Sequence, residues 1–458
     1  MRTIGIDLAV TATHKAVVVN DTGQFVSPVL SFRSSWEEIS HLVAQAREGV
    51  EADHPLQAVM EPTGMAWFST AVPLTRLGVT VYLVNGRKVA DLRRYYKRHA
   101  GSDRISARVL AKLPLVDAES LYPLAIPTAV QLACQRGCKQ DDRLQTWITA
   151  IQNRLLDTDR FAWPGLEQVL PEPFGATARL FRQDWYDPVR VIEAGPQRLA
   201  EVFTAVVGLQ DDLSWMPGLV ELAIDVLKLY GLEALDYSRL QEEIRRDQEL
   251  LAKLEQQQAE VQKDTVQPLY RQLHPSRHLE TLYGVGEKGA PVFASFIGRA
   301  DRFVDNRHFR GWHGLVPDSR QSGESESKGL RISQAGPDLI KKFGFMGANT
   351  ARRFDPQVAA IYYDQMVNKG QHHTQAVCAC ATHLLDRILV ILREDRPYEL
   401  RDVDGTAVTP DRARAIIAER YQVPEEVRRR NCKRTRQERA EQQAERRRPK
   451  QKGSRPRR

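Results

Sequence analysis

Apolar residues in the first part of the chain recur with the two-residue period of strands and the wider period of helices. Short runs rich in Val, Ile and Leu predict strands near residues 3–7, 14–19, 27–32, 57–61 and 79–85. The segments 35–48 and 66–77 between them have helical spacing. This βββαβα-like order predicts an α/β domain over residues 1–125.

Longer helical patterns dominate residues 126–275. Apolar residues recur at helical spacing from about 128 to 160 and from 237 to 272, on either side of a segment that Pro and Gly interrupt. In the second stretch an approximate heptad of apolar residues is interrupted by Asp247 and Gln258. The apolar residues of this heptad are Leu240, Ile244, Leu251, Leu254 and Val261. The pattern predicts a coiled-coil-like pair of helices, formed within the chain or between two copies.

A further, mainly helical domain is expected over residues 276–400. It opens on a helix followed by the turn Tyr283-Gly284-Val285-Gly286. Glycines without Cβ atoms let backbone amides approach a phosphate, as in helix-hairpin-helix modules. An ordinary turn between helices explains the same residues equally well. The loop 317–329 that follows is too polar to belong to a core.

Composition narrows the class of protein. The chain has 458 residues, of which 42% are hydrophobic, enough for two or three domains with their own cores. No stretch approaches the ~20 uninterrupted apolar residues that span a bilayer, and the Met1-Arg2 start lacks the apolar core of a signal peptide. We therefore expect a cytoplasmic protein that does not act at a membrane.

The cysteines indicate neither a disulfide framework nor a zinc site. There are five of them, an odd number in a long chain. Two groups of Cys and His residues lack finger-like spacing and are expected to be ordinary helix residues. These groups are Cys134 with Cys138, and His372 and His373 with Cys378 and Cys380.

Positive charge is concentrated at the C-terminal end. Residues 427–458 hold 15 Lys and Arg against 3 Asp and Glu, a net charge of +12, which leaves −4 for the rest of a chain whose total is +8. A tail of this composition cannot bury apolar surface, so residues 401–458 are expected to be a basic, partly disordered extension that phosphates attract. A tail that only increases solubility is the alternative.

Two carboxylates follow apolar runs in the α/β domain. Asp7 closes the run that begins at Thr3, and Glu61 follows the run 58–60. Strands that end in acids place those acids on one edge of a sheet, where they can share a divalent metal such as Mg²⁺ and hold it against a phosphodiester. A basic helix is expected beside this edge and suits a nucleic-acid groove, although a solvated helix face is an equal alternative. Its cations are Arg93, Arg94, Lys97 and Arg98, interleaved with Tyr95 and Tyr96.

Several segments, taken in order, resemble the transposases of bridge-RNA-guided insertion sequences, whose relatives include pilin gene invertases. The N-terminal segments are Ile4-Gly5-Ile6-Asp7, Glu61-Pro62-Thr63-Gly64 and 102–111. The C-terminal segments are Tyr283-Gly284-Val285-Gly286, Phe303, 314–317, 320–323, 331–336 and Lys369-Gly370. The resemblance implies an RNase H-like, RuvC-like domain with four acids, then a coiled coil, then a C-terminal domain with a nucleophilic serine.

The resemblance also implies roles for individual residues. Asp7, Glu61 and Asp103 match three of the four acids that hold Mg²⁺, and Ser106 stands in the fourth position, where its hydroxyl or a water completes the metal shell. Ser322 matches the nucleophilic serine, which would form a phosphoserine link that preserves the energy of the broken bond. Apart from the resemblance, Arg320 and Arg331 flank the loop and are candidates to clamp a phosphate. Lys341, Lys342, Arg352 and Arg353 form a basic edge, for which phosphate contact and ordinary solvation are equal alternatives. Ser319, Ser325 and Ser327 are neighbouring alternatives to Ser322.

The implied function is a DNA recombinase that moves an insertion sequence. Donor and target DNA would be chosen by a structured guide RNA, and the active site would be assembled from two domains of a homo-oligomer. No nucleotide-binding phosphate loop is present, as expected when the serine link conserves energy. One alternative is a RuvC-type nuclease or junction resolvase in which water attacks. Another is a nucleic-acid-binding protein without catalysis, because Ser106 replaces an acid.

Overall fold

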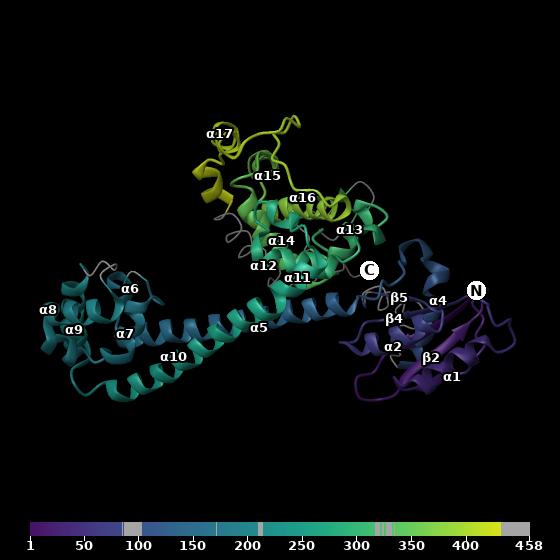
Figure 1. Ribbon diagram of the computed structural model, residues 1–458, viewed down its shortest axis with the longest axis horizontal. Coiled ribbons are helices and arrows are strands. Elements are labelled where there is room, and N and C mark those ends of the chain that lie inside the picture. Colours follow the sequence, from purple (N-terminus) through teal and green to yellow (C-terminus); the bar gives the residue numbers. More distant parts are fainter. Residues whose placement is uncertain are drawn as a thin grey trace, which may run out of the picture. The chain divides into compact units, whose positions relative to one another are not determined.

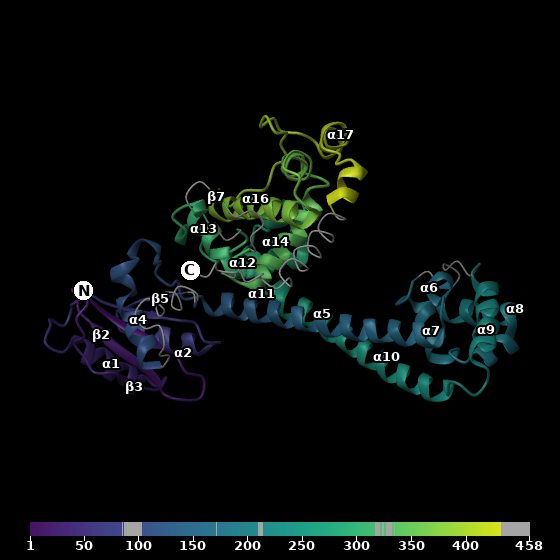
Figure 2. The same ribbon diagram turned by 180° about the vertical axis from the view of Figure 1, so that it is seen from behind.

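The chain folds into two compact units, Met1–Thr128 and Ala129–Arg458, each with its own core. The computed structural model describes residues 1–84, 86, 103–170, 172–208, 214–316, 321–322, 325–326, 332–333 and 335–431. Figures 1 and 2 show the same chain from opposite sides. The division after Thr128 lies close to the expected end of the first domain at residue 125, and the further boundaries at 275 and 400 remain predictions.

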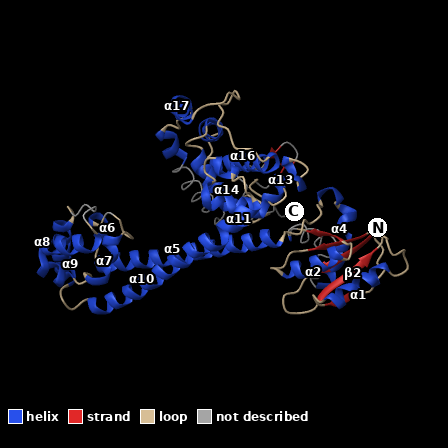
Figure 3. Cartoon of the chain, in the orientation of Figure 1, coloured by secondary structure: helices blue, strands red, loops and turns tan. Residues whose placement is uncertain are grey.

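The first unit is built on a mixed five-stranded sheet, which confirms the predicted α/β class. The strand order is β3-β2-β1-β4-β5, with β1 antiparallel to β2 and parallel to β4, and β4 parallel to β5. Figure 3 shows the strands of this sheet in red. The strands are β1 (Arg2–Asp7), β2 (His14–Val19), β3 (Leu30–Phe32), β4 (Leu56–Met60) and β5 (Thr80–Leu83). The strand predicted from residue 27 begins only at Leu30, because Pro28 has no N–H to donate to the ladder.

Helices cover both faces of this sheet. On one face, α1 (Trp36–Arg47) and α2 (Ala66–Arg76) enclose Ile4, Ile6 and Met60. On the other face, α4 (Asp103–Val116) packs on alternate residues such as Val17 and Val59. The period of two in each strand therefore supplies one apolar row to each layer. A short 3-10 helix, η1 (Ala118–Ser120), follows α4.

A long antiparallel pair of helices begins the second unit. α5 (Ala129–Ala162) and α10 (Tyr237–Glu260) lie side by side in both views (Figures 1 and 2). The polar interruptions of the predicted heptad meet partners on α5. Asp247 forms an ion pair with Arg154, and the Gln258 amide nitrogen lies 3.2 Å from the Gln145 side-chain oxygen. The helices thus pair within one chain, and both polar positions of the seam are satisfied.

Four helices are inserted between α5 and α10 and have a separate core. They are α6 (Leu166–Val169), α7 (Ala176–Asp184), α8 (Pro188–Val207) and α9 (Met216–Tyr230). Trp163, Phe181 and Tyr186 are fully buried there. Arg182 is buried with Asp159, at 2.6 Å from Nη2 to Oδ2. The sequence pattern predicted only an interrupted segment here, because Pro and Gly break the helices, as at Gly195 with φ of 67° inside α8.

The rest of the second unit is helical and packs around α16. Its elements are η2 (Val261–Val266), α11 (Gln267–Leu273), η3 (His278–Thr281), α12 (Gly286–Ile297), η4 (Ala300–Arg302), α13 (Asn306–His313), β6 (Gln321–Ser322), β7 (Ser325–Glu326), α14 (Asp338–Ala351), α15 (Pro356–Tyr363), η5 (Asp364–Asn368), α16 (His373–Glu394) and α17 (Pro410–Arg420). In the Gly-x-Gly turn, Gly284 has φ of +88°, and a Cβ there would lie 2.1 Å from the Gly347 oxygen. Gly284 therefore allows close packing on α14, whereas Gly286 faces open space.

Within the part of the chain that the structure describes, α16 alone has the length and apolar composition to cross a membrane. Many of its apolar side chains, among them Val377, Leu384 and Ile388, are completely buried in the C-terminal core. Burial on this scale is typical of the central helix of a folded domain, so α16 gives no indication of a membrane protein.

Candidate active site

Asp7 and Glu61 lie next to each other at the carboxyl edge of the sheet. The neighbouring strands β1 and β4 are parallel, and their register pairs Ile6 with Met60. Each acid is the next residue after this pair, so the two carboxylates leave the same edge of adjacent strands. Both residues are partly exposed. The adjacency that the two apolar runs predicted is therefore present.

The Glu61 carboxylate occupies space next to Gly86. A Cβ on residue 86 would lie 2.3 Å from Glu61 Oε1, so the Glu61 carboxylate would have to move to make room for it. Residue 86 follows β5, which is parallel to β4 and ends at Leu83 opposite Met60. Glycine at this position leaves room for the Glu61 carboxylate at the edge of the sheet.

Helix α4 crosses β1 and runs in the opposite direction. Its later residues lie at the far end of the sheet, since a Cβ on Gly23, in the turn that follows Val19 and the end of β2, would lie 2.8 Å from Leu115 Cδ1. Val19 pairs with Thr3 near the start of β1. The first turn of α4 therefore points toward the end of β1 that carries Asp7.

The contact at Gly5 sets the height of α4 over the sheet. A Cβ on Gly5 would lie between Ala107 and Ala111, 2.1 Å from the Ala107 oxygen. From Gly5 to Asp7 the strand rises about 6.6 Å, at ~3.3 Å per residue. At ~1.5 Å per residue, the same height on α4 corresponds to about four residues toward its N-terminus. For a helix antiparallel to β1, residues 103 and 106 are therefore expected on the turn of α4 that is level with Asp7.

The backbone of Asp103 begins α4, but its side chain is outside the described part of the structure. Ser106, in the expected fourth position, is buried at 5% exposure. Among the side chains that are described, no three or more of His, Cys, Asp and Glu gather closely enough to hold a metal. The oxygen donors that are described, two adjacent carboxylates on one edge, fit a hard cation such as Mg²⁺, which keeps several waters.

A pocket opens at the same end of the sheet as the acids, on the face that α2 covers, and no sequence motif indicated it. It measures about 490 Å³ and is lined by the loops that follow Asp7 and Glu61, by Arg33 and Ser34, and by the start of α2. His14 is buried in its wall, where Nδ1 accepts the Ala9 N–H at 3.1 Å and Nε2 lies 2.9 Å from Ser34 Oγ. Burial lowers the pKa of His14, so its ring is neutral near pH 7.

The backbone of the predicted nucleophile, Ser322, lies in a small hairpin. β6 pairs antiparallel with β7, and Ser322 is opposite Ser325. The side chain of Ser322 is not among those described, and neither are those of the alternative serines. Arg320 and Arg331 also lie outside the described residues, as do Arg93, Arg94, Lys97 and Arg98. The roles of all these residues remain predictions.

Lys341 and Lys342 stand next to each other on α14 but differ in their surroundings. The Lys341 ammonium lies 3.2 Å from the Ala335 oxygen and 2.9 Å from Asp338 Oδ1, and its side chain is only 14% exposed. Lys342 is more exposed and pairs with Asp142 on α5. Each lysine therefore already has a partner within the protein, which a nucleic-acid phosphate would have to replace.

A group of cations that the sequence suggested only in part lies at the end of the second unit. The Arg352 guanidinium is 4.4 Å from the centre of the Tyr362 ring, and the Tyr362 hydroxyl lies 2.8 Å from His373 Nδ1. Burial, followed by the positive charge of Arg352 and Arg428, lowers the pKa of His373. The cations therefore lie close enough to His373 to disfavour its protonation.

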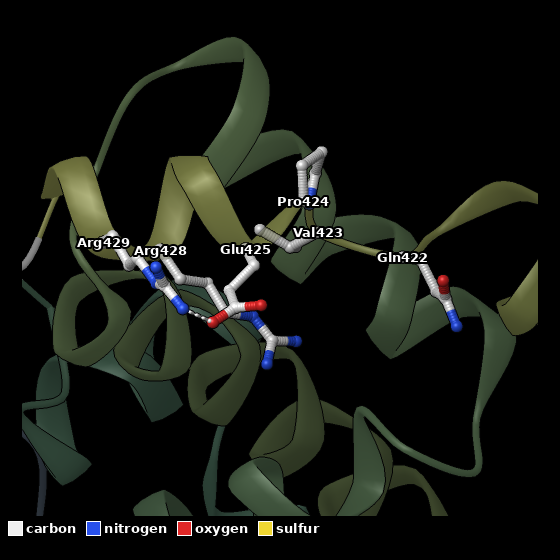
Figure 4. Close-up of a pocket in the computed structure, with 6 residues that line it drawn as sticks. All are labelled: Gln422, Val423, Pro424, Glu425, Arg428 and Arg429. Carbon is white, nitrogen blue, oxygen red and sulfur yellow. Dashed lines mark hydrogen bonds and ion pairs between the residues drawn. The ribbon is translucent and has the colours of Figure 1, made fainter.

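Arg428 belongs to a short helix, 425–431, that borders a surface pocket of about 800 Å³ (Figure 4). Its neighbour Arg429 pairs with Glu425, as the figure shows, whereas no acid among the described residues pairs with Arg428. Asn431 ties the helix down by donating to the Gln371 oxygen at 3.0 Å. Arg428 thus adds an available positive charge to the surface that carries Arg352 and His373.

The cysteines are structural where they are described. Cys134 and Cys138 are buried between α5 and α12, and burial raises the pKa of the Cys380 thiol to about 12. No group of metal ligands forms around them among the described side chains. Their surroundings are those of ordinary core thiols, as expected from the spacing.

Comparison with known proteins gives two transposase matches. Residues 276–363 match the family described as Transposase IS116/IS110/IS902 family, and residues 4–160 match a transposase domain of the DEDD type found in IS110 elements. The second match contains the sheet edge with Asp7 and Glu61, together with α4. The first contains the Gly-x-Gly turn and the hairpin of Ser322.

Individual relatives agree with these matches. An uncharacterized 43.6 kDa protein of insertion element IS110 from Streptomyces coelicolor is 26% identical over 333 residues, 69% of this chain and 75% of the relative. The pilin gene-inverting protein of Moraxella bovis is 27% identical over 28% of this chain and 40% of its own length. An uncharacterized 42 kDa protein of insertion element IS900 from Mycobacterium paratuberculosis is 27% identical over 30% of this chain and 34% of its own length. Both domains and these relatives assign the chain to the IS110/IS116/IS902 family of transposases, enzymes that in general cut and rejoin DNA.

Proposed function

We propose that this transposase cuts and rejoins the strands of an insertion sequence through a link between Ser322 and a DNA phosphate, assisted by Mg²⁺. The observation that carries the proposal is the register of β1 and β4, which puts Asp7 beside Glu61 on one edge of the sheet. The direction of α4 adds support, since its first turn, with residues 103 and 106, points toward the end of β1 that carries Asp7. The strand order and the helix on the opposite face are compatible with an RNase H-like domain.

In the proposed reaction, the oxygen of Ser322 attacks phosphorus and forms a P–O bond, while the bond from phosphorus to a deoxyribose oxygen breaks. The leaving oxygen takes up a proton and becomes a free hydroxyl. Rejoining reverses this step, with a deoxyribose hydroxyl as the attacking group and Ser322 as the leaving group. The number of phosphodiester bonds is conserved, so no nucleotide hydrolysis is needed.

The acids contribute the negative charge that such a reaction needs for a cation. Asp7, Glu61 and Asp103 would hold Mg²⁺, with Ser106 or water filling a remaining position. When bound, Mg²⁺ neutralises charge that develops on the phosphate oxygens. A serine in place of a fourth acid removes one negative charge, so the proposed site binds the metal more weakly than a site with four acids would.

A guide RNA and a homo-oligomer complete the proposal. The resemblance to bridge-RNA-guided elements supports an RNA partner, and the cations around Arg352 and Arg428 offer a surface for a phosphate backbone. The names of the Moraxella relatives describe inversion of a gene, a rearrangement in which both strands are cut and rejoined. These relatives support strand exchange rather than simple cleavage.

The decisive experiment compares the intact chain with Ser322→Ala on supercoiled DNA that carries the ends of the element, with Mg²⁺ and the RNA transcribed next to the gene. We expect the wild type to form a covalent protein–DNA species that resists denaturation, together with joined product. Ser322→Ala should form neither. Ser325→Ala is the matched control from the same hairpin and should retain both.

Undiminished cutting by Ser322→Ala without any covalent protein–DNA species would instead establish the RuvC-type nuclease, in which water attacks. A covalent species that persists in Ser322→Ala would assign the attack to a neighbouring serine. Tight binding without cutting by the wild type would establish a binding protein.

A further inference from the structure

The pocket at the same end of the sheet as Asp7 and Glu61 is suited to an anion. Its lining contains one cation, Arg33, together with the hydroxyl groups of Ser34, Thr63 and Ser69, and it contains no acid. This composition contrasts with the edge of the sheet directly before it, where two carboxylates stand together. A pocket lined by hydrogen-bond donors near an acidic edge is the arrangement expected where a metal on the acids binds one phosphate and the protein binds another directly.

The loops that line the pocket start at the two acids. Ala9 lies two residues after Asp7, and Thr63 lies two residues after Glu61. The pocket is therefore only a few ångströms of backbone from the carboxylates, at ~3.3 Å per extended residue. Asp7 lies on the same face of the sheet as Gly5, toward α4, whereas His14 in the pocket wall lies on the same face as Ala16, toward α1 and α2. A DNA strand that runs from the acids to the pocket would therefore cross the end of the sheet.

Among the described residues, no acid forms an ion pair with the Arg33 guanidinium. The backbone N–H of Arg33 donates to Glu38 Oε2 at 2.6 Å. The residue is exposed at the rim of the pocket. An arginine fork in this position can hold two phosphate oxygens at once, so it supplies both charge and orientation.

The hydroxyl network fixes which group can donate to a ligand. His14 Nδ1 accepts from Ala9, so the proton of the neutral ring is on Nε2, which donates to Ser34 Oγ. The Ser34 oxygen also lies 3.1 Å from Ser69 Oγ, whose single proton is equally close to the Ala66 oxygen at 3.1 Å. Because Ser34 accepts from His14, its own proton is left to donate to Thr70 Oγ1 at 3.1 Å, to Ser69 or into the pocket. Buried His14 thus leaves the Ser34 proton available as a donor.

We propose that this pocket, built from Arg33, Ser34 and Thr63, binds the backbone phosphate that neighbours the one at the acids, and so fixes the register of the DNA strand. The inference rests on the proposed function for the identity of the strand, since it is the acids that define the reacting phosphate. The ligand is a phosphodiester of DNA. The pocket takes no part in bond breaking and acts by positioning.

Binding without cutting tests the pocket separately from the chemistry. The probe is a short DNA duplex, titrated with the intact protein in the absence of added divalent metal, at several salt concentrations. Arg33→Ala should weaken binding about tenfold, the usual effect of losing one hydrogen-bonded charge. The slope of log affinity against log salt should fall by roughly 0.9, the value for one phosphate contact on a duplex.

Arg76→Ala is the matched control. Arg76 is an exposed arginine at the other end of α2, where it stacks on Trp36 at 4.9 Å. Like Arg33→Ala, Arg76→Ala removes one positive charge from the first unit, but it should leave the salt slope unchanged. Arg33→Lys should keep most of the slope, and Arg33→Met, which keeps the aliphatic stem, should lose it as Arg33→Ala does.

An unchanged slope in Arg33→Ala and Arg33→Met, or an equal loss in Arg76→Ala, would overturn the proposal. An effect seen only with RNA of the same sequence would overturn its assignment to DNA. Because no strand is cut in this assay, failure here leaves the role of Ser322 and the acids untouched. If Ser322 or the acids turn out not to be needed for cutting, the salt slope measured for Arg33→Ala still stands.

Discussion

The Cα of Gly5 lies directly against the backbone of Ala111, where a Cβ on residue 5 would be 2.2 Å from the Ala111 nitrogen. β1 and α4 therefore meet with no side chain between them on this face. Their separation determines the height at which the first turn of α4 passes the Asp7 edge. Glycine at position 5 thus acts on the candidate active site through helix packing, from two residues before the acid.

Gly5→Ala tests this relationship. A methyl group must push α4 away from the sheet, and overpacking of this kind costs about 1–3 kcal/mol of folding free energy. We expect lower stability in urea and a loss of strand cutting larger than the loss of DNA affinity, because α4 carries Asp103. Gly311→Ala, a position on α13 with open space around it, is the control and should change neither. Equal activity of Gly5→Ala and wild type would show that the height of α4 is unimportant.

Removal of the acids should act on metal affinity first. Asp7→Asn and Glu61→Gln keep shape but remove a negative charge from the edge, and even outer-shell partners of metals are worth roughly 10–100-fold in affinity. Calorimetric titration with Mg²⁺ or Mn²⁺ should show a loss of at least this size, and cutting should stop, as it should in the wild type with a chelator. Asp53→Asn, an exposed acid before β4, is the control. Full metal-dependent cutting by Asp7→Asn would contradict the assignment.

Arg428 and Arg429 offer a comparison between neighbouring arginines. Arg429 already pairs with Glu425, whereas Arg428 adds its charge near Arg352 and His373 (Figure 4). Arg428→Ala should therefore lower the salt dependence of nucleic-acid binding by roughly one phosphate contact, and Arg429→Ala should lower it much less. Affinity measured against salt for DNA and RNA checks this. Equal effects of the two substitutions would mean that the tail region binds without a defined surface.

His313 should make the stability of the protein depend on pH. Its ring is fully buried, with Nδ1 accepting the Leu315 N–H at 3.1 Å, and burial lowers its pKa to about 4. The unfolded chain, with an ordinary histidine pKa near 6.5, therefore binds more protons between these values. Stability is complete above about pH 6.5 and falls toward pH 4, by an amount on the order of 3 kcal/mol for this group.

The measurement is the free energy of unfolding in urea at pH 7 and near pH 4.5. His313→Gln, which stays neutral at both pH values, should lose less stability between them than the wild type. His41→Gln, on the exposed side of α1, should behave as the wild type does. If His313→Gln lost more unfolding free energy than the wild type between pH 7 and pH 4.5, the predicted direction of the His313 contribution would be wrong.

Much of the first unit was predictable because its strands alternate cleanly. The runs that end at Asp7 and Glu61 predicted both strands and the side-by-side position of the acids. The pocket was not predictable, since its walls come from loops at residues 9–14, 33–34 and 63–69 that meet only when β1, β2 and β4 have paired. The position of residues 103 and 106 relative to Asp7 was not predictable either. It depends on the packing of Gly5 against α4, a contact between residues far apart in the sequence.

In the second unit, helix propensity did not predict the helices that contain prolines and glycines. Pro188 starts α8, and Gly195 with Pro196 bends it, so a pattern that indicates interruption is compatible with a folded helical core. The long helices α5 and α10 were easier to predict from the sequence. Asp247 and Gln258, which weakened the heptad, turned out to have partners on α5 that lie about a hundred residues away in sequence. The roles of Ser322 and of the arginines outside the described residues remain predictions.

The α5 and α10 pair constrains how the length of this chain can change. α5 has 34 residues, about 50 Å at ~1.5 Å per residue. Cys134 near its start belongs to one core and Leu155 near its end to another. One residue inserted between them would turn the two cores by about 100° relative to each other and separate Arg154 from Asp247. Viable insertions and deletions here should therefore come in matched steps of about seven residues in both helices, so that the spacing of the two cores changes by whole pairs of turns.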